Sequence, residues 1–148
     1  MAKRKHHSHE ITMAEAELIC RRSGGRFTPL RRQVFEVLLH AHAPLSAYEL
    51  LGKLRRSRGA TPAAVYRSLE FLGARGLAHR LESRKAYLAC IHPEHPHVSQ
   101  FLICKRCGTA VEVEDPRIAS VMRHWSRKHG FRTESEPLEV SGFCGTCR

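Results

Sequence analysis

Long hydrophobic runs are missing from this sequence of 148 residues. None approaches the roughly 18 apolar residues that a membrane-spanning helix needs. The basic N-terminal stretch, MAKRKHHSHE, is not followed by the apolar segment of a secretory signal. We therefore expect a cytoplasmic protein whose thiols stay reduced. In that compartment the six cysteines are better explained as metal ligands or buried thiols than as disulfides.

Two sequence patterns of zinc enzymes are also missing. The chain has neither H-E-x-x-H nor the combination of H-x-E with a later P-C-x-x-C. These patterns supply the open metal position and the general acid or base Glu of zinc hydrolases and deaminases. The sequence also has no stripe of exposed aromatic residues, which a zinc-ribbon protein that stacks RNA bases would need. The chain is therefore predicted not to be an enzyme.

Acidic residues are few relative to basic ones, and the net charge is +11. The excess lies in the first part of the chain. Residues 1–90 carry 17 Lys and Arg against 7 Asp and Glu, whereas residues 91–148 carry 8 against 7. A basic half joined to a nearly neutral half suggests that one part binds a polyanion and the other has a different role. The alternative is a generally basic soluble protein.

The first half carries the start signals of several helices. Thr-Pro pairs at 28–29 and 61–62 are typical of a helix start, and Ser46 with Glu49 forms a capping box. Helices are predicted over residues 11–22, 29–41, 46–55 and 61–76, followed by a two-stranded hairpin over 77–90. Their apolar periodicity predicts inward-facing side chains at Leu30, Val34, Val37, Leu38, Leu50, Leu51, Leu54, Val65, Leu69 and Leu72. This layout is that of a winged helix-turn-helix.

The second half reads as a small domain with strands and one helix. Residues 91–97 form a linker stiffened by two prolines. Strands are predicted on both sides of the Cys104–Cys107 turn, then a helix from Asp115 that Gly130 ends, then a strand over 137–141. The predicted fold class is α+β, with a basic and His-containing arm (1–10), a winged-helix domain (11–90), a hinge (91–97) and a zinc-stapled domain (98–148).

Two C-x2-C pairs carry the strongest chemical signal. Cys104 with Cys107, and Cys144 with Cys147, each place two thiols on one tight turn. Zn²⁺ prefers four ligands in a tetrahedron, so two pairs make one complete structural site. A domain as small as residues 98–148 is stabilised by a metal ion that joins its two cysteine turns. Redox-active pairs are the alternative, but no nucleophile context accompanies them.

Four further potential ligands surround the linker. His79 and Cys90 lie near the base of the predicted hairpin, His97 ends the linker, and Glu112 follows the first cysteine pair. Mixed sulfur, nitrogen and oxygen ligation suits four-coordinate Zn²⁺ better than ferrous iron. Each residue also has an ordinary explanation: a surface or core histidine, a small buried thiol, or the solvent face of a strand.

Other histidines and one cysteine are weaker candidates. Competing ligands for the second site are His92, His95 and His124, and the N-terminal arm adds His6, His7 and His9. Cys20 lies on the first predicted helix with no partner in the sequence, so it is interpreted as a core residue.

The helix that starts at Thr61 is the candidate for reading DNA. In a helix-turn-helix the second helix enters the major groove. Arg67 lies on the face opposite Val65, where an Arg can contact guanine with two hydrogen bonds. Thr61 and Tyr66 are placed to bind phosphate or sugar, and Tyr48 lies close to the same groove. The alternative is that these are ordinary solvated residues. The cations of the neighbouring hairpin, Arg80, Arg84 and Lys85, favour DNA binding over that alternative.

These motifs together resemble the ferric uptake regulator family. The resemblance rests on RFTPLRRQVFEVL, TPAAVYRSLEFL, GLAHRLE, FLICKRCG and FCGTC, and it covers nearly the whole chain. Iron-sensing members usually have a His-rich run with an Asp before the first cysteine pair, and HPEHPHVSQFLIC lacks the full run. The zinc uptake regulator branch is more similar, because it has ligands that match His79, Cys90, His97 and Glu112. The resemblance further implies a homodimer joined through the C-terminal domain and base-reading roles for Tyr48 and Arg67.

The predicted function is that of a zinc-sensing repressor of zinc-uptake genes. It would bind double-stranded operator DNA as a homodimer and hold two Zn²⁺ per chain, one structural and one regulatory. No membrane and no small-molecule substrate are expected as partners. The alternative is a regulator that senses iron or manganese on the same scaffold.

Overall fold

The computed structural model describes residues 11–90, 92–93, 99–133 and 138–148. The chain divides into two compact units, one within Lys3–Pro96 and the other within His97–Arg148. The predicted N-terminal arm and most of the predicted hinge lie outside the described residues. Within the described residues, no helix is both long enough and apolar enough to cross a membrane.

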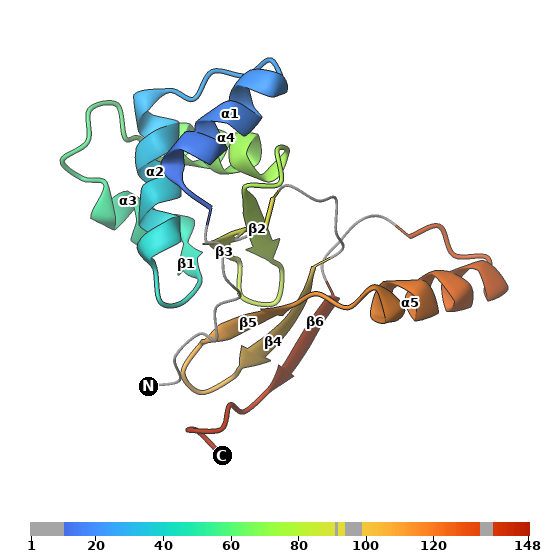
Figure 1. Cartoon of the computed structure of the whole chain (residues 1–148). Helices are drawn as coiled ribbons and strands as arrows, with labels where there is room; N and C mark the ends of the chain where they lie inside the picture. The colour runs from blue at the N-terminus through green and yellow to red at the C-terminus, as the bar shows by residue number, and fades with distance from the viewer. Residues whose placement is uncertain (1–10, 91, 94–98, 134–137) are drawn as a thin grey trace. The chain divides into compact units, whose positions relative to one another are not determined.

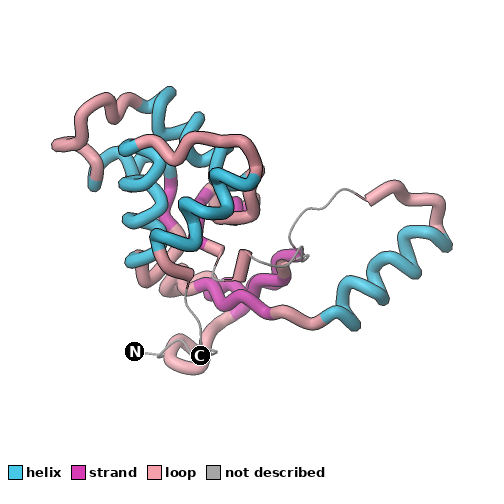
Figure 2. Tube along the Cα trace, turned by 45° about the horizontal axis from the view of Figure 1, so that its top comes forward, coloured by secondary structure: helices cyan, strands magenta, loops and turns pink. Residues whose placement is uncertain are grey.

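The first unit is built from short helices with strong N-terminal caps. Side chains of Thr28, Ser46 and Thr61 accept a hydrogen bond from the first turn of the helix that follows each of them. A fourth cap, which the sequence reading missed, is the capping box of Thr12 with Glu15. The helices are α1 (Met13–Arg22), α2 (Pro29–His40), α3 (Ala47–Lys53) and α4 (Pro62–Gly73). Figure 2 shows these four helices in cyan.

These helices pack around one hydrophobic core. The predicted inward-facing residues fall into two groups: Val34, Leu38, Leu50, Leu54, Val65, Leu69 and Leu72 are buried, whereas Leu30, Val37 and Leu51 are partly buried against the same cluster. The same core contains Phe35 and Phe71, which were not predicted. Both lie one residue before or after a predicted position, so the buried stripe is wider than a minimal helical pattern indicates.

A three-stranded sheet closes the first unit. Strands β2 (Ala78–Leu81) and β3 (Ala86–Ala89) form the predicted antiparallel hairpin. The short strand β1 (Leu45–Ser46), which the sequence reading missed, pairs with β3, so the order is β1-β3-β2. Lys85 adopts a φ of 47° at the hairpin turn, in the left-handed region that reverses a chain tightly. Helices followed by this hairpin make the predicted winged helix-turn-helix (Figure 1).

The second unit contains one sheet and one helix. Strands β4 (Gln100–Cys104), β5 (Ala110–Val113) and β6 (Leu138–Gly142) are arranged in the order β5-β4-β6. Strand β5 is antiparallel to β4 and β6 is parallel to it. Helix α5 (Pro116–Lys128) begins after Asp115, whose carboxylate accepts the Arg117 N–H at 2.9 Å.

The core of the second unit is small. Its buried apolar residues among those described are Phe101, Ile103, Cys104 and Ala110, all on β4 and β5. Helix α5 buries no residue, and Val121, Met122 and Trp125 on it are each about half exposed at 55%, 47% and 47%. A unit with so little buried apolar surface needs stabilisation from another source.

Candidate metal centres and nucleic-acid interface

Sheet topology brings the two cysteine pairs of the second unit together. Cys104 ends β4, and Cys144 and Cys147 follow β6. Because β4 and β6 are parallel, with Cys104 in register with Gly142, both pairs emerge at the same end of the sheet. A backbone hydrogen bond from the Lys105 N–H to the Gly142 carbonyl, 2.8 Å long, joins the two turns there.

The four thiols form a compact cluster. The sulfurs of Cys104, Cys107, Cys144 and Cys147 all lie within 4.8 Å of one another. The Cys107 and Cys144 sulfurs are 3.7 Å apart. A tetrahedral Zn²⁺ with Zn–S bonds of about 2.3 Å requires sulfurs about 3.8 Å apart, so the cluster matches the size of that donor set. The sequence-predicted set is therefore assembled as a group that fits one metal ion.

Backbone donors prepare part of this cluster for metal binding. Hydrogen bonds from the Cys107 and Cys144 backbone N–H groups lower the pKa of the Cys104 thiol to about 6. The Cys144 N–H lies 3.4 Å from the Cys104 sulfur. Hydrogen bonding by Thr146 lowers the pKa of Cys144 as well, whereas the neighbouring Cys144 sulfur raises the pKa of Cys147 to about 12. A pKa that is lowered at one thiol and raised at its neighbour is expected of sulfurs this close together, because they lose their protons one after the other.

Two of the second set of predicted ligands lie together on the hairpin of the first unit. His79 is on β2, and Cys90 directly follows β3, where its N–H donates to the Leu77 carbonyl at 2.9 Å. A ring nitrogen of His79 and the Cys90 sulfur lie within 4.8 Å of each other. Cys90 is fully buried and His79 is partly buried. The antiparallel pairing of the two strands accounts for this proximity.

The other predicted ligands of that set belong to the second unit. Glu112 is partly buried on β5 and accepts a hydrogen bond from the Ser99 hydroxyl at 2.9 Å. His97 lies outside the described residues, as do the competing candidates His95, His6, His7 and His9.

The remaining candidates have other surroundings. His124 is exposed on α5 and its ring packs edge-on against Trp125, with the ring centres 5.8 Å apart. Neither His92 nor His124 belongs to a group of three clustered potential ligands in the part of the chain that is described. Cys20 is fully buried in the core of the first unit, where burial raises the pKa of its thiol. Its interpretation as a core residue is confirmed.

The predicted DNA-reading residues are accessible on the first unit. Tyr48, near the start of α3, is 78% exposed, and Tyr66 on α4 is 51% exposed. Arg67 is also exposed, whereas its neighbours Ser68 and Leu69 are buried. Thr61 caps α4 by accepting the Ala64 N–H at 3.2 Å. The exposed face of α4 thus presents Tyr66 and Arg67 to solvent, where a helix that enters a DNA groove needs its contact residues.

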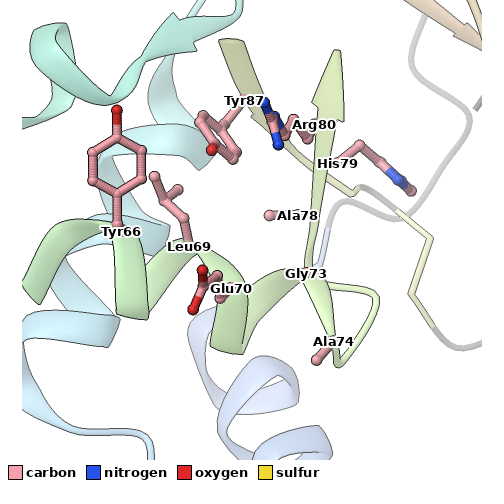
Figure 3. A pocket seen from close by; sticks show the side chains of 9 residues that line it. All are labelled: Tyr66, Leu69, Glu70, Gly73, Ala74, Ala78, His79, Arg80 and Tyr87. Atoms are coloured by element: carbon pink, nitrogen blue, oxygen red, sulfur yellow. The ribbon is translucent and has the colours of Figure 1, made fainter. Parts of the chain in front are cut away.

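An open hollow of about 380 Å³ lies between α4 and the hairpin (Figure 3). Tyr66 and Glu70 line it from α4, and Arg80 and Tyr87 line it from the strands. Figure 3 shows the His79 ring on the other side of β2 from Arg80, in agreement with the alternation of side chains along a strand. The two faces of the hairpin therefore have separate surroundings: one borders the α4 surface and the other presents the His79 ring.

Comparison with known proteins adds one family match and three similar proteins. The sequence model of the ferric uptake regulator family matches residues 22–141. The zinc uptake regulation protein of Escherichia coli (strain K12) is 35% identical over 137 residues, which cover 91% of this chain and 80% of that protein. A crystal structure of holo XcZur has a TM-score of 0.82 at 40% identity, covering 90% of this chain and 94% of that one. A structure of a zinc uptake regulator complexed with zinc and DNA has a TM-score of 0.85 at 34% identity, covering 90% and 91%.

Proposed function

Because the chain belongs to the ferric uptake regulator family, we propose that it is a zinc-responsive DNA-binding repressor of zinc-uptake genes and not an enzyme. The observation that carries the zinc-sensing part is the buried Cys90 thiol beside the His79 ring. These two donors are separate from the four-cysteine cluster, so the chain has the start of a second metal site. Support also comes from the similarity to regulators that are described as acting in zinc uptake.

The first Zn²⁺ has a structural role in this proposal. Cys104, Cys107, Cys144 and Cys147 use all four tetrahedral positions, which leaves no open position for a substrate. The ion joins the turn after β4 to the turn after β6 and so supplies stability that the small core of this unit does not. Absence of an open coordination position agrees with a protein that carries out no reaction.

The second Zn²⁺ has the regulatory role. His79 and Cys90 from the first unit bind it together with His97 and Glu112 from the second. Each chain therefore holds two Zn²⁺ ions. Since these ligands come from both sides of the 91–97 hinge, loading of this site restricts the arrangements that the two units can adopt. Zinc shifts the equilibrium between these arrangements only if it binds the DNA-competent one more tightly than the others. To change the ratio of DNA-competent to other arrangements from 1:99 to 99:1, it must bind the DNA-competent one about 10⁴-fold more tightly.

The DNA-binding form is a homodimer. Residues 11–90 make the DNA-binding domain and residues 98–148 the dimerisation domain, where the exposed apolar side chains of α5 support contact with a second copy. Two DNA-binding domains then face major-groove segments about one helical turn apart. Arg67 and Tyr48 read bases, while Thr61 and Tyr66 bind the backbone. When zinc is plentiful, the zinc-loaded dimer binds its promoters in the cytoplasm and represses transcription from them.

Iron or manganese is the alternative sensed metal on the same scaffold. The chain is 26% identical to the ferric uptake regulation protein of Campylobacter jejuni over 145 residues, so the scaffold itself does not decide the metal. The donor set does favour one of them. A thiolate ligand such as Cys90 suits Zn²⁺, whereas ferrous iron and manganese prefer nitrogen and oxygen ligands in a larger coordination shell.

A titration of DNA affinity against free metal tests this function. Operator sequences are first selected from a random duplex pool with the zinc-loaded protein. Their affinity should rise with free Zn²⁺ after the four-cysteine site is full, and should rise much less with Fe²⁺ or Mn²⁺. Cys90→Ser should abolish the rise. Cys20→Ser is the matched control, because it makes the same chemical change at another fully buried cysteine of the same unit and should leave the rise intact. Affinity that does not depend on zinc would refute the proposal.

A further inference from the structure

The turn between α3 and α4 carries four cations and no acidic residue within seven positions. We define the basic turn as residues 53–59. It carries Lys53, Arg55, Arg56 and Arg58, all exposed. No acidic residue occurs between Glu49 and Glu70 in the sequence. Among the described residues, none of the four cations forms an ion pair with a carboxylate of the chain.

This turn is a folded structure and not a loose basic loop. The Ser57 N–H donates to the Leu54 carbonyl at 2.8 Å, and the Ala60 N–H donates to the Ser57 carbonyl at 3.2 Å. Leu54 is 3% exposed and anchors the turn in the hydrophobic core. Gly59 has a φ of +80°, a conformation that other residues rarely adopt, and it turns the chain into α4. The arginines are therefore displayed by a defined backbone.

The basic turn leads directly into the predicted DNA-reading helix. Two residues after Gly59, Thr61 caps α4, and Arg67 follows on the exposed face of that helix. Helix N-termini and guanidinium groups both favour phosphate oxygens. A helix placed in the major groove has phosphates of the flanking strands on either side, so a basic segment at its start meets the DNA backbone.

We propose that Arg55, Arg56 and Arg58 of the basic turn bind the phosphodiester backbone of DNA beside the groove that α4 enters. The inference rests on the proposed DNA-binding function and adds to it a surface that supplies affinity without reading sequence. Continuity with α4 favours DNA over an acidic protein as the partner. Guanidinium groups bind phosphate through two parallel hydrogen bonds, so these three side chains are suited to contact the DNA backbone.

The expected effect is on the salt dependence of binding. Each phosphate that a cation neutralises changes the slope of log affinity against log salt by about −0.9. Loss of two such contacts makes the slope about 1.8 less steep, so the affinity advantage of the wild type shrinks about 12-fold between 50 and 200 mM salt. Since phosphates carry no sequence information, the ratio of affinities for selected and mixed-sequence duplexes should not change.

The test compares two double variants with equal loss of charge. Arg56→Gln with Arg58→Gln removes two cations of the basic turn. Arg22→Gln with Arg26→Gln removes two exposed cations at and just after the end of α1, which lies on the opposite side of the first unit from the turn (Figure 1). The wild type and both variants are titrated in the zinc-loaded state, over a range of salt, with a mixed-sequence duplex and with a selected duplex. The wild type is also titrated with both duplexes after its removable zinc has been chelated.

A less steep slope for the turn variant and an unchanged slope for the α1 variant would support the inference. An equal change in both variants, no change in the turn variant, or a loss confined to the selected duplex would overturn it. The proposed function is tested separately in the same experiment. If the wild type shows no zinc-dependent preference for any selected duplex, that function is wrong and this inference falls with it.

Discussion

Replacement of a single cysteine in the second unit should unfold that unit and leave the first one intact. The clearest case is Cys104→Ser, because Cys104 ends the central strand β4 and is 4% exposed. Among the described residues of this unit, the large buried apolar side chains are Phe101 and Ile103, and each contributes about 1.5–3 kcal/mol by burial. Binding of a structural Zn²⁺ is worth about 10–16 kcal/mol in small zinc domains. Metal binding therefore exceeds the contribution of the core, and loss of one ligand removes most of what holds the unit together.

Intrinsic fluorescence can follow the two units separately. The single tryptophan, Trp125, lies on α5 in the second unit, where its ring stacks on His129 with the ring centres 5.7 Å apart. All three tyrosines lie in the first unit. In Cys104→Ser the tryptophan transition on heating should be lost or shifted strongly downward, while circular dichroism still reports the helical transition of the first unit.

Metal analysis and a control complete this test. Cys104→Ser should lose one zinc equivalent per chain, whereas Cys20→Ser should keep both zinc equivalents and the wild-type tryptophan transition. If Cys104→Ser retained its zinc and its tryptophan melting temperature, the structural role of the four-cysteine cluster would be refuted.

Four further predictions concern the other sites and the cap of α3. Cys90→Ser and His79→Ala should each lose one removable zinc per chain and, with it, the zinc-dependent rise in operator affinity. Their melting temperatures should stay close to that of the wild type; loss of the fold would show that the pair is structural. Arg67→Gln should weaken operator binding by about 1–3 kcal/mol and reduce the preference for one particular base pair. Binding to operators with single-base changes measures this. An equal loss of affinity for all sequences would show that Arg67 contacts the DNA backbone instead. Ser46→Ala should lower the free energy of unfolding by about 1 kcal/mol through loss of the α3 cap, measured by urea denaturation. Hydrogen bonds from the Ser46 hydroxyl and N–H, both 2.7 Å, lower the pKa of Glu49 from its usual 4.5. A carboxylate whose pKa is lowered by folding stabilises the folded state above its unfolded pKa, and this stability is lost as the pH falls through the folded pKa. Glu49→Gln should therefore flatten the fall in stability at acid pH, below 4.5; an unchanged acid profile would contradict this reasoning.

Local signals in the sequence predicted most of the first unit. Thr-Pro starts and the capping box at Ser46 fix helix starts within a few residues, so the starts of α2, α3 and α4 were correctly predicted. The capping box of Thr12 with Glu15 is equally local and was overlooked. The pairing of β1 with β3 could not be predicted from the sequence, because a two-residue strand is too short to show a periodic pattern.

The candidate sites were predictable to different degrees. Two C-x2-C pairs identify four ligands directly, since the spacing within each pair is itself the geometric requirement. Their assembly depends on the parallel pairing of β6 with β4, which joins segments more than 30 residues apart and leaves no local trace. His79 and Cys90 meet only through the hairpin register. The basic turn was visible in the sequence as a run of arginines, but its folded backbone was not.

The most direct test of the central claim is the zinc affinity of the removable site, measured with and without operator DNA. Thermodynamic linkage requires that if zinc raises operator affinity by some factor, the operator raises zinc affinity by the same factor. We predict tighter zinc binding in the presence of a selected operator and no difference with a mixed-sequence duplex at equal concentration. Zinc affinity that is the same with and without the operator, while the four-cysteine site stays full, would contradict zinc sensing by this protein.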